Sequence, residues 1–347
     1  MNQSVTENRP QRLKVGWIEI SSKKHGGFIY REEARQALSK EFDVELVSCE
    51  PKYLKDFKYL KMLEAFFNVF KLKGEKDIWI RDYFPALMMR TKKTKGINIV
   101  MVHHIDIEGL PKISIPIFRV LTKIFYHNLW NADAIITRAE IWRKHFSDLG
   151  YKNVYKIYGG SDLEKFKFSE QEISDFKKAN NLLGKPVIYI GNRQKAKGVL
   201  ETYEALKDLE VHLVTTGVKD VELPAPHFDL SYRDYLKLLT ASSVVITMST
   251  FKEGWCRTAH EAMLCRTPVI GSGLGGMKEL LEGGNQIICT DFPNLKSEVD
   301  NLLNNPQKRE DLGKKGYDFV KQFTLEKFGE DWRNTIKNIL QKNGKNA

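Results

Sequence analysis

The strongest constraint on the fold is an alternation of short β-branched runs with longer segments of helical period, which occurs twice along the chain. The first series has strand-like runs at 13–20, 44–47, 77–80, 97–102 and 134–137, with helical segments such as 30–40 and 53–71 between most of them. The second series has runs at 186–190, 211–215, 244–248, 268–270 and 286–289, with helical segments near 198–206, 232–240 and 258–264. Such alternation is typical of βα units and parallel sheets. It predicts two doubly wound α/β domains, with ligands bound beyond the carboxyl ends of the strands in the cleft between them.

The length agrees with this reading, because 347 residues make about two domains of roughly 100–200 residues each. We expect a polar, disordered tail over 1–12, a first domain over 13–165 and a second over 166–325. A last helix over 326–347 would be placed to cross back to the first domain. No apolar run approaches the roughly 20 residues of a membrane span, and the first residues have no apolar signal-peptide core. The four cysteines have neither zinc-site nor disulfide spacing, which favours a cytoplasmic location.

The net charge of +11 is concentrated in the first half of the chain. Residues 1–165 contain 29 Lys and Arg against 20 Asp and Glu, whereas residues 166–347 contain 26 against 24. This asymmetry predicts an anionic partner, which could be a membrane surface, a nucleic acid or a phosphorylated substrate. The helical segment 53–73 gathers Leu60, Leu63, Phe66, Phe67 and Phe70 on one face, opposite Lys58, Lys61 and Lys71. That pattern suits either a helix at a membrane interface or one that packs on the sheet.

The segment 249–280 is the most informative for chemistry. Glu253 lies in a loop after a strand, Gly254 gives that loop backbone freedom, and Glu261 lies on the helix that follows. A helix N-terminus and a second glycine loop at 271–276 both favour anions such as phosphate. The alternative is that the two carboxylates are solvated helix-end residues and the glycines are only turns. The ordered succession of strand, loop, helix, strand and loop favours the functional reading.

This segment, EGWCRTAHEAMLCRTPVIGSGLGGMKE, resembles the Glu-x7-Glu signature of the family 4 retaining glycosyltransferases, which have the GT-B fold. YIGNRQKAKG at 189–198 and VYKIYGGSDLEKF at 154–166 resemble the family's Gly–Arg…Lys–Gly loop and interdomain segment. HGGFIYREEARQALSKEFDVELV resembles its first glycine loop and helix. The sequence departs from the family pattern at Trp255, Cys256 and Arg266, and Asn192 separates Gly191 from Arg193.

The resemblance implies a role for each matching residue. Arg193 and Lys197 would hold the diphosphate of a nucleotide sugar, in place of a metal ion, and Glu253 would contact the transferred sugar. Glu261 would bind the ribose, and the family places a His near the transferred sugar, which here is His103, with His104 on the acceptor side. The remaining donor-binding residues would be Gly26, Gly27, Gly254, Thr258, Gly275 and Gly276. Arg81 and Asp82, which also follow a strand, are expected to form a structural ion pair.

The resemblance therefore implies a retaining, metal-independent and cofactor-free glycosyltransferase. It would move a sugar from a nucleotide diphosphate donor, by default a UDP-sugar, to a lipid-linked or glycan acceptor at the inner face of the cell membrane. Three alternatives remain: a nucleotide-sugar-binding relative without turnover, a GT-B epimerase and a nucleic-acid-binding protein. The last is disfavoured because no RRM, KH or zinc-finger pattern occurs in the sequence.

Overall fold

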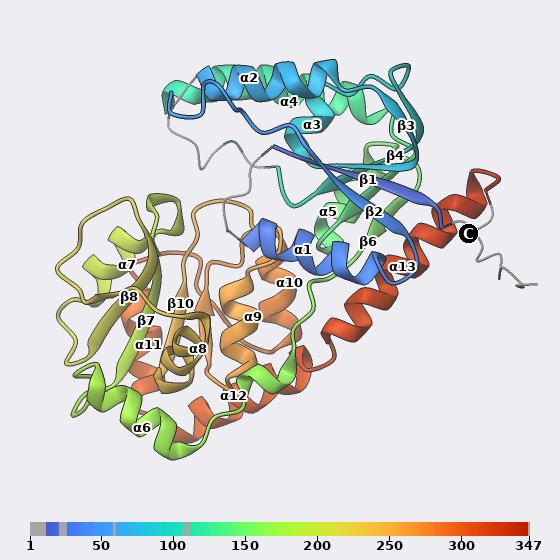
Figure 1. The fold of residues 1–347 in the computed structure, drawn as a ribbon. Helices are drawn as coiled ribbons and strands as arrows, with labels where there is room; N and C mark the ends of the chain where they lie inside the picture. Colours follow the sequence, from blue (N-terminus) through green and yellow to red (C-terminus); the bar gives the residue numbers. More distant parts are fainter. Residues whose placement is uncertain (1–11, 21–25, 58–59, 106, 108–111, 346–347) are drawn as a thin grey trace, which may run out of the picture.

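The protein folds into two α/β domains that lie one against the other in the computed structural model (Figure 1). The structure describes residues 12–20, 26–57, 60–105, 107 and 112–345. Most of the predicted tail over 1–12 lies outside these residues. The predicted fold class, two parallel-sheet Rossmann-like domains, is confirmed.

The first domain is built on a six-stranded parallel sheet with the strand order β2-β1-β3-β4-β5-β6. Its strands are β1 (Lys14–Glu19), β2 (Asp43–Ser48), β3 (Gly74–Arg81), β4 (Thr94–Val102), β5 (Ala134–Thr137) and β6 (Val154–Lys156). The central strands β1, β3, β4 and β5 are buried over most of their length, as their β-branched runs predict.

The helices of the first domain differ from the sequence expectation in two places. They are α1 (Gly26–Leu38), α2 (Leu60–Lys71), α3 (Tyr83–Leu87), α4 (Ile115–Leu129, after a 3₁₀ turn at Lys112–Ser114) and α5 (Glu140–Asp148). The helix expected from residue 53 begins only at Leu60, because the Glu64 carboxylate accepts hydrogen bonds from the amides of residues 52–54 and holds them as a turn. Helix α4 was not predicted at all.

The second domain has its own six-stranded parallel sheet, with the order β12-β11-β10-β7-β8-β9. Numbered from β7, this is the doubly wound order of dinucleotide-binding domains. Its strands are β7 (Val187–Arg193), β8 (His212–Lys219), β9 (His227–Phe228), β10 (Val244–Thr247), β11 (Val269–Gly271) and β12 (Ile287–Ile288). Its helices are α6 (Glu170–Ala179), α7 (Val199–Leu206), α8 (Tyr232–Ala241), α9 (Arg257–Leu264), α10 (Gly276–Gly283), α11 (Leu295–Leu303) and α12 (Pro306–Val320). Two 3₁₀ turns, at Leu163–Phe166 and Lys195–Lys197, complete it.

The chain crosses between the domains twice, at adjacent positions. Ser161 on the outward crossing forms a parallel bridge with Thr324 on the return, with backbone hydrogen bonds on both sides of it. The last helix, α13 (Leu325–Lys342), then runs back along the first domain (Figure 1). Its Trp332 packs 5.4 Å from the ring of Trp17 on β1 and 6.1 Å from that of Tyr30 on α1. The core of the first domain is therefore completed by a helix that follows the second domain in the sequence.

Candidate active site

The centre of the candidate site is a buried carboxylate in the loop that follows β10. Glu253 is 7% exposed, accepts a 2.6 Å hydrogen bond from the hydroxyl of Ser249, and forms an ion pair with Lys197. Lys197 ends the 3₁₀ turn after β7, and its ammonium also lies 4.8 Å from the ring centre of Phe251. The carboxyl ends of two neighbouring strands, β7 and β10, thus bring together the residues of two separate motifs.

The charge of Lys197 depends on its acidic neighbour. Burial alone lowers the pKa of Lys197, but the adjacent Glu253 carboxylate outweighs burial, so the pKa is raised overall. Lys197 is therefore a fixed positive charge at neutral pH. An ammonium has three donors, so the ion pair with Glu253 leaves capacity to bind an anion.

Glycines allow three backbone segments to approach one another around Glu253. A Cβ on Gly254 would lie 2.2 Å from the carbonyl oxygen of His103, and one on Gly276 would lie 2.0 Å from that of Gly254. Gly198 and Gly275 have left-handed φ values of 66° and 67°. The amide of Gly276 donates a 2.8 Å hydrogen bond to the carbonyl of Glu253, so in this structure it holds the loop and is not free for a phosphate, in contrast to the expectation.

Both histidines after β4 reach this loop from the first domain. His103 contacts Gly254 through its backbone and has Arg138 3.4 Å from its Nδ1. The His104 ring lies 5.5 Å from that of Phe251. The indole of Trp142 on α5 donates a 3.1 Å hydrogen bond to the carbonyl of Glu253. The structure thus brings His103 against the Glu253 loop, and its role near the transferred sugar stays a prediction.

Arg193 lies in a different environment from the one expected. Its guanidinium is buried, donates to Thr215 on β8 at 3.0 Å and to the carbonyl of Ala225, and pairs with Glu222 at 3.3 Å. These contacts tie β7 to β8 and to the segment before β9. They support a structural role, so the expected diphosphate contact stays a prediction that this geometry does not favour.

The second glutamate of the motif is already occupied by two side chains. Glu261 is buried on α9, pairs with Arg257 at 2.6 Å, and accepts a 2.8 Å hydrogen bond from the hydroxyl of Tyr232 on α8. Burial alone would lower the pKa of Arg257, but the neighbouring Glu261 carboxylate raises it, and the pKa is raised overall. The pKa of Tyr232 is raised by burial and by the same carboxylate. Thr258 lies beside Arg257 in the first turn of α9. Sequence reasoning overlooked Arg257, although it stands one helical turn before Glu261.

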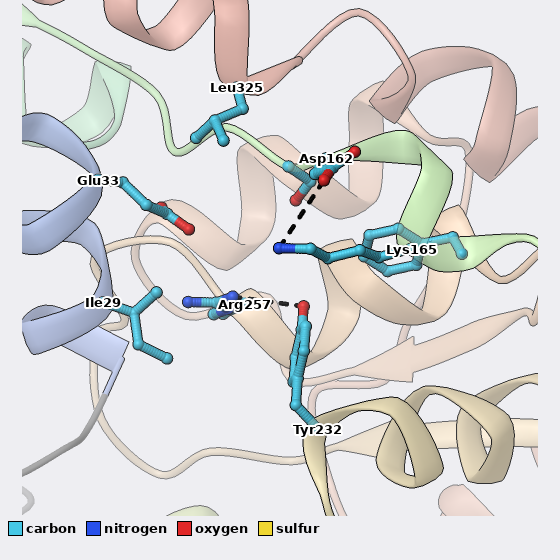
Figure 2. A pocket seen from close by; sticks show the side chains of 9 residues that line it. Ile29, Glu33, Asp162, Lys165, Tyr232, Arg257 and Leu325 are labelled. Carbon is cyan, nitrogen blue, oxygen red and sulfur yellow. Dashed lines mark hydrogen bonds and ion pairs between the residues drawn. The ribbon is translucent and has the colours of Figure 1, made fainter. Parts of the chain in front are cut away.

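Arg257 also faces the first domain across a small cavity of 180 Å³ (Figure 2). Ile29 and Glu33 of α1 line one side of it, and Lys165 and Tyr232 line the other. Burial raises the pKa of Glu33, and the nearby positive charge of Arg257 only partly offsets this rise. The two domains therefore meet at Glu261 as well as at Glu253, which places both glutamates of the motif at the junction.

A second and larger cavity, of 810 Å³, lies within the first domain at the carboxyl ends of β1, β3 and β4. Gly27, in the first turn of α1, lines it together with His103 and His104. Gly26 is the first residue of the same helix, so the two glycines start a helix where a loop was expected. The contact of His103 with Gly254 brings this cavity next to the loop that carries Glu253.

The expected ion pair between Arg81 and Asp82 is wrong. The Arg81 guanidinium is buried on the other side of the strand, where it donates to Asn98 at 3.0 Å and to Thr94 at 2.7 Å. Asp82 instead lines the large cavity. Consecutive residues at a strand end point to opposite faces, which separates the two side chains.

Helices α2 and α4 carry exposed apolar stripes on the face of the first domain that lies farthest from the second domain (Figure 1). On α2 the stripe consists of Leu60, Leu63, Phe67 and Phe70, and on and before α4 it consists of Ile113, Ile117, Val120 and Ile124. The side of α2 that packs inward is instead formed by Ala65 and Val69. The second stripe was missed because α4 was missed, although its spacing of four, three and four residues is a helical signal.

Within the described ranges, no three His, Cys, Asp or Glu side chains gather closely enough to hold a metal ion. All four cysteines are buried and unpaired. The charge that faces Glu253 is therefore a lysine in the part of the chain that the structure describes.

Comparison with known proteins connects this geometry to a family. Most of the second domain, residues 170–319, matches the family model described as "Glycosyl transferases group 1". This range includes Lys197, Glu253 and Glu261. An uncharacterised glycosyltransferase of Methanocaldococcus jannaschii is 26% identical over 266 residues, which are 68% of this chain and 74% of that protein. Spore coat protein SA of Bacillus subtilis is 28% identical over 225 residues, or 55% of this chain and 58% of the relative.

Solved structures extend the similarity to the first domain. Sucrose-phosphate synthase of Thermosynechococcus elongatus superposes with a TM-score of 0.81 at 15% identity, over 95% of this chain and all of that one (100%). HepE of Anabaena, solved in complex with UDP-glucose, gives 0.73 at 17% identity, over 94% and 100%. At these identities the likeness establishes the fold alone, which is that of GT-B glycosyltransferases.

Proposed function

We propose that this chain, a group 1 glycosyltransferase with the GT-B fold, moves a sugar from a UDP-sugar to an acceptor held by the first domain, with retention and without a metal ion. The observation that carries the proposal is the ion pair between the half-buried Lys197 and the buried Glu253, placed where His103 of the first domain meets Gly254 of the second.

Lys197 would stabilise the departing diphosphate. Negative charge grows on the diphosphate as the bond from sugar to phosphate breaks, and a cation fixed beforehand stabilises that charge without reorganisation. The Glu253 carboxylate and the Phe251 ring hold the ammonium in place. Glu253 would accept hydrogen bonds from hydroxyls of the transferred sugar, since a carboxylate has more acceptor sites than Lys197 and Ser249 use.

Glu261 would bind the ribose of the nucleotide. Its carboxylate already accepts from Arg257 and Tyr232, so a ribose hydroxyl would join or replace those donors. UDP is the preferred nucleotide because HepE, which shares the fold, was solved with UDP-glucose. Retention would follow from attack on the face that the diphosphate leaves, with a phosphate oxygen taking the acceptor's proton.

The acceptor would be a lipid-linked glycan, presented by an anionic membrane. The apolar stripes of α2 and α4 lie uncovered on either side of the first-domain cavity, which Met62 and Ala65 of α2 and Phe118 of α4 line. Basic side chains stand among them: Lys71 lies 4.0 Å from the Phe67 ring centre, and Arg90 lies 4.7 Å from that of Phe70. Apolar residues flanked by cations suit the interface of an anionic leaflet.

This attachment would be peripheral and at the cytoplasmic face. Among the described residues, the structure has no helix with the length and apolarity that crossing a membrane requires. Lys58, which the sequence analysis counted among the basic residues of this face, lies outside the described residues.

The test is hydrolysis of a panel of UDP-, GDP- and ADP-sugars by the full chain, with and without EDTA. We expect release of one nucleotide, most readily from a UDP-sugar, with less than a twofold change in EDTA. Hydrolysis that stops in EDTA and returns with Mg²⁺ or Mn²⁺ would overturn the metal-independent mechanism. Binding of a nucleotide sugar without any release would instead identify a non-catalytic relative.

A further inference from the structure

The floor of the first-domain cavity holds a carboxylate that the chain leaves incompletely paired. Asp82 follows β3 and occupies the N-cap position of α3, with an extended backbone. Its side chain makes no capping hydrogen bond. Its Oδ1 is buried and has no hydrogen-bond partner among the described residues. A buried polar atom without a partner costs about 1–3 kcal/mol, so it calls for an explanation.

Charges of both signs surround Asp82, because Arg31, Lys55, Lys61 and Glu50 line the same cavity. Arg31 of α1 is buried, forms an ion pair with Glu19, and lies 3.8 Å from the Glu32 carboxylate. Burial raises the pKa of Asp82 to about 7, against the opposing effect of Arg31. Arg31 is thus already engaged with Glu19 and does not form an ion pair with Asp82 among the contacts of the described residues.

The walls above this floor are apolar. Phe28 of α1, Met62 and Ala65 of α2, Phe84 of α3 and Phe118 of α4 line the same 810 Å³ space. His103 lines it on the side of the second domain, where it contacts Gly254. The cavity is therefore bounded on one side by His103, which contacts the Glu253 loop, and on the other by the helices whose outer faces are apolar.

We propose that Asp82 binds the acceptor, by hydrogen bonding through its carboxyl group to a hydroxyl of a sugar or polyol head group whose apolar chain leaves between α2 and α4. The inference rests on the proposed transferase function and names the residue that selects its acceptor. A hydroxyl can both donate and accept, so it satisfies the Asp82 carboxyl whether that group is ionised or protonated. An ammonium, which only donates, would satisfy the ionised form alone.

A structural carboxylate in the same domain provides the contrast. Asp133 accepts a 2.7 Å hydrogen bond from the amide of Asn98 on β4, so the fold itself uses it. Removing the charge of Asp133 should lower the melting temperature. Removing that of Asp82 should not, because an unpaired buried carboxylate contributes nothing favourable to the folded state without its ligand.

The experiment compares Asp82→Asn, Asp82→Leu and Asp133→Asn with the wild-type full chain. Three quantities are measured: the melting temperature, hydrolysis of the UDP-sugar without acceptor, and transfer to a panel of n-octyl glucoside, galactoside, mannoside and N-acetylglucosaminide below their micellar concentrations. We expect both Asp82 variants to keep or raise the melting temperature and to keep donor hydrolysis within twofold. Their kcat/KM for the octyl glycoside should fall by about ten- to a hundredfold, the loss of a hydrogen bond to a charged group.

Each result bears on a separate claim. Unchanged transfer by the Asp82 variants would overturn the inference, as would a fall in melting temperature, hydrolysis and transfer together. The inference also fails alone if the wild type hydrolyses a UDP-sugar but binds no octyl glycoside in saturation-transfer NMR. Absence of both nucleotide binding and hydrolysis in the wild type would instead remove the proposed function on which the inference rests.

Discussion

Glu253 and Asp82 are two carboxylates on opposite sides of the domain junction, and the chain treats them differently. Glu253 has a cation, a hydroxyl and a locked backbone around it before any ligand arrives. Asp82 has a buried oxygen with no hydrogen-bond partner among the described residues and an 810 Å³ space beside it. The second domain is thus arranged in advance for a ligand of fixed shape, whereas the first domain depends on its ligand to complete its polar contacts.

This difference fits the two substrates proposed. A nucleotide diphosphate has the same charged groups whatever sugar it carries, so a preorganised cation is effective in every turnover. Acceptors vary in shape, and a mostly apolar cavity with one carboxylate at its floor selects by a few contacts.

The largest effect is expected from Lys197→Ala. Loss of one preorganised charge from a buried site should lower the kcat for donor hydrolysis by about a hundred- to a thousandfold. Steady-state kinetics with the preferred UDP-sugar would measure it. The melting temperature should be followed in parallel, because the variant leaves the buried Glu253 without its cation.

Lys195→Ala is the matched control, because Lys195 is exposed in the same 3₁₀ turn. The control should retain hydrolysis within about twofold, as expected of an exposed cation. Near wild-type kcat in Lys197→Ala would show that the preorganised side of the comparison does not depend on this charge.

The sequence predicted the second domain better than the first because its motifs are local. Lys197 and Gly198 lie within one turn, and Glu253 to Glu261 spans one loop and the first turn of α9, so spacing alone places them. The strands of both sheets could be predicted because buried parallel strands are continuous apolar segments. The side-chain contacts of Arg193 could not be predicted from spacing, because its partners lie on β8 and in the segment before β9, which are distant in sequence.

The first-domain cavity could not be predicted in the same way. Its lining comes from the ends of three strands and from four helices, and each residue is unremarkable in its own segment. Asp82 was read as the partner of Arg81 because the two are adjacent, but alternation at the strand end turns them apart. Glu64 shortened α2 by accepting hydrogen bonds from a turn ten to twelve residues before it, which no helical period reveals.

A smaller effect is expected from Glu261→Ala and from Glu261→Gln, which keeps the side-chain shape. Ribose contacts exist in the ground state and the transition state alike, so the donor KM should rise by about tenfold with little change in kcat. Isothermal titration with UDP would measure the same loss directly. Glu282→Ala, an exposed glutamate at the end of α10 paired with Lys278, is the control and should change neither value. A fall in kcat at unchanged KM would mean that Glu261 acts on the reaction and not on nucleotide binding.

The smallest effect concerns the apolar stripes, and it tests whether the first domain depends on a surface as well as on a ligand. Leu63 on α2 is 63% exposed, so its side chain is free to enter the apolar layer of a membrane. Leu63→Ser should weaken binding to anionic vesicles by about fivefold, close to 1 kcal/mol for a leucine that is only partly transferred. Flotation with phosphatidylglycerol vesicles at low salt would measure this, and binding should also weaken as ionic strength screens the basic residues around the stripes.

Leu183→Ser is the matched control, because Leu183 is 54% exposed in the second domain, away from α2 and α4, and should leave flotation unchanged. Equal losses in the two variants would indicate nonspecific adsorption. No flotation of the wild type would remove the membrane from the comparison and leave the first-domain cavity to a water-soluble acceptor.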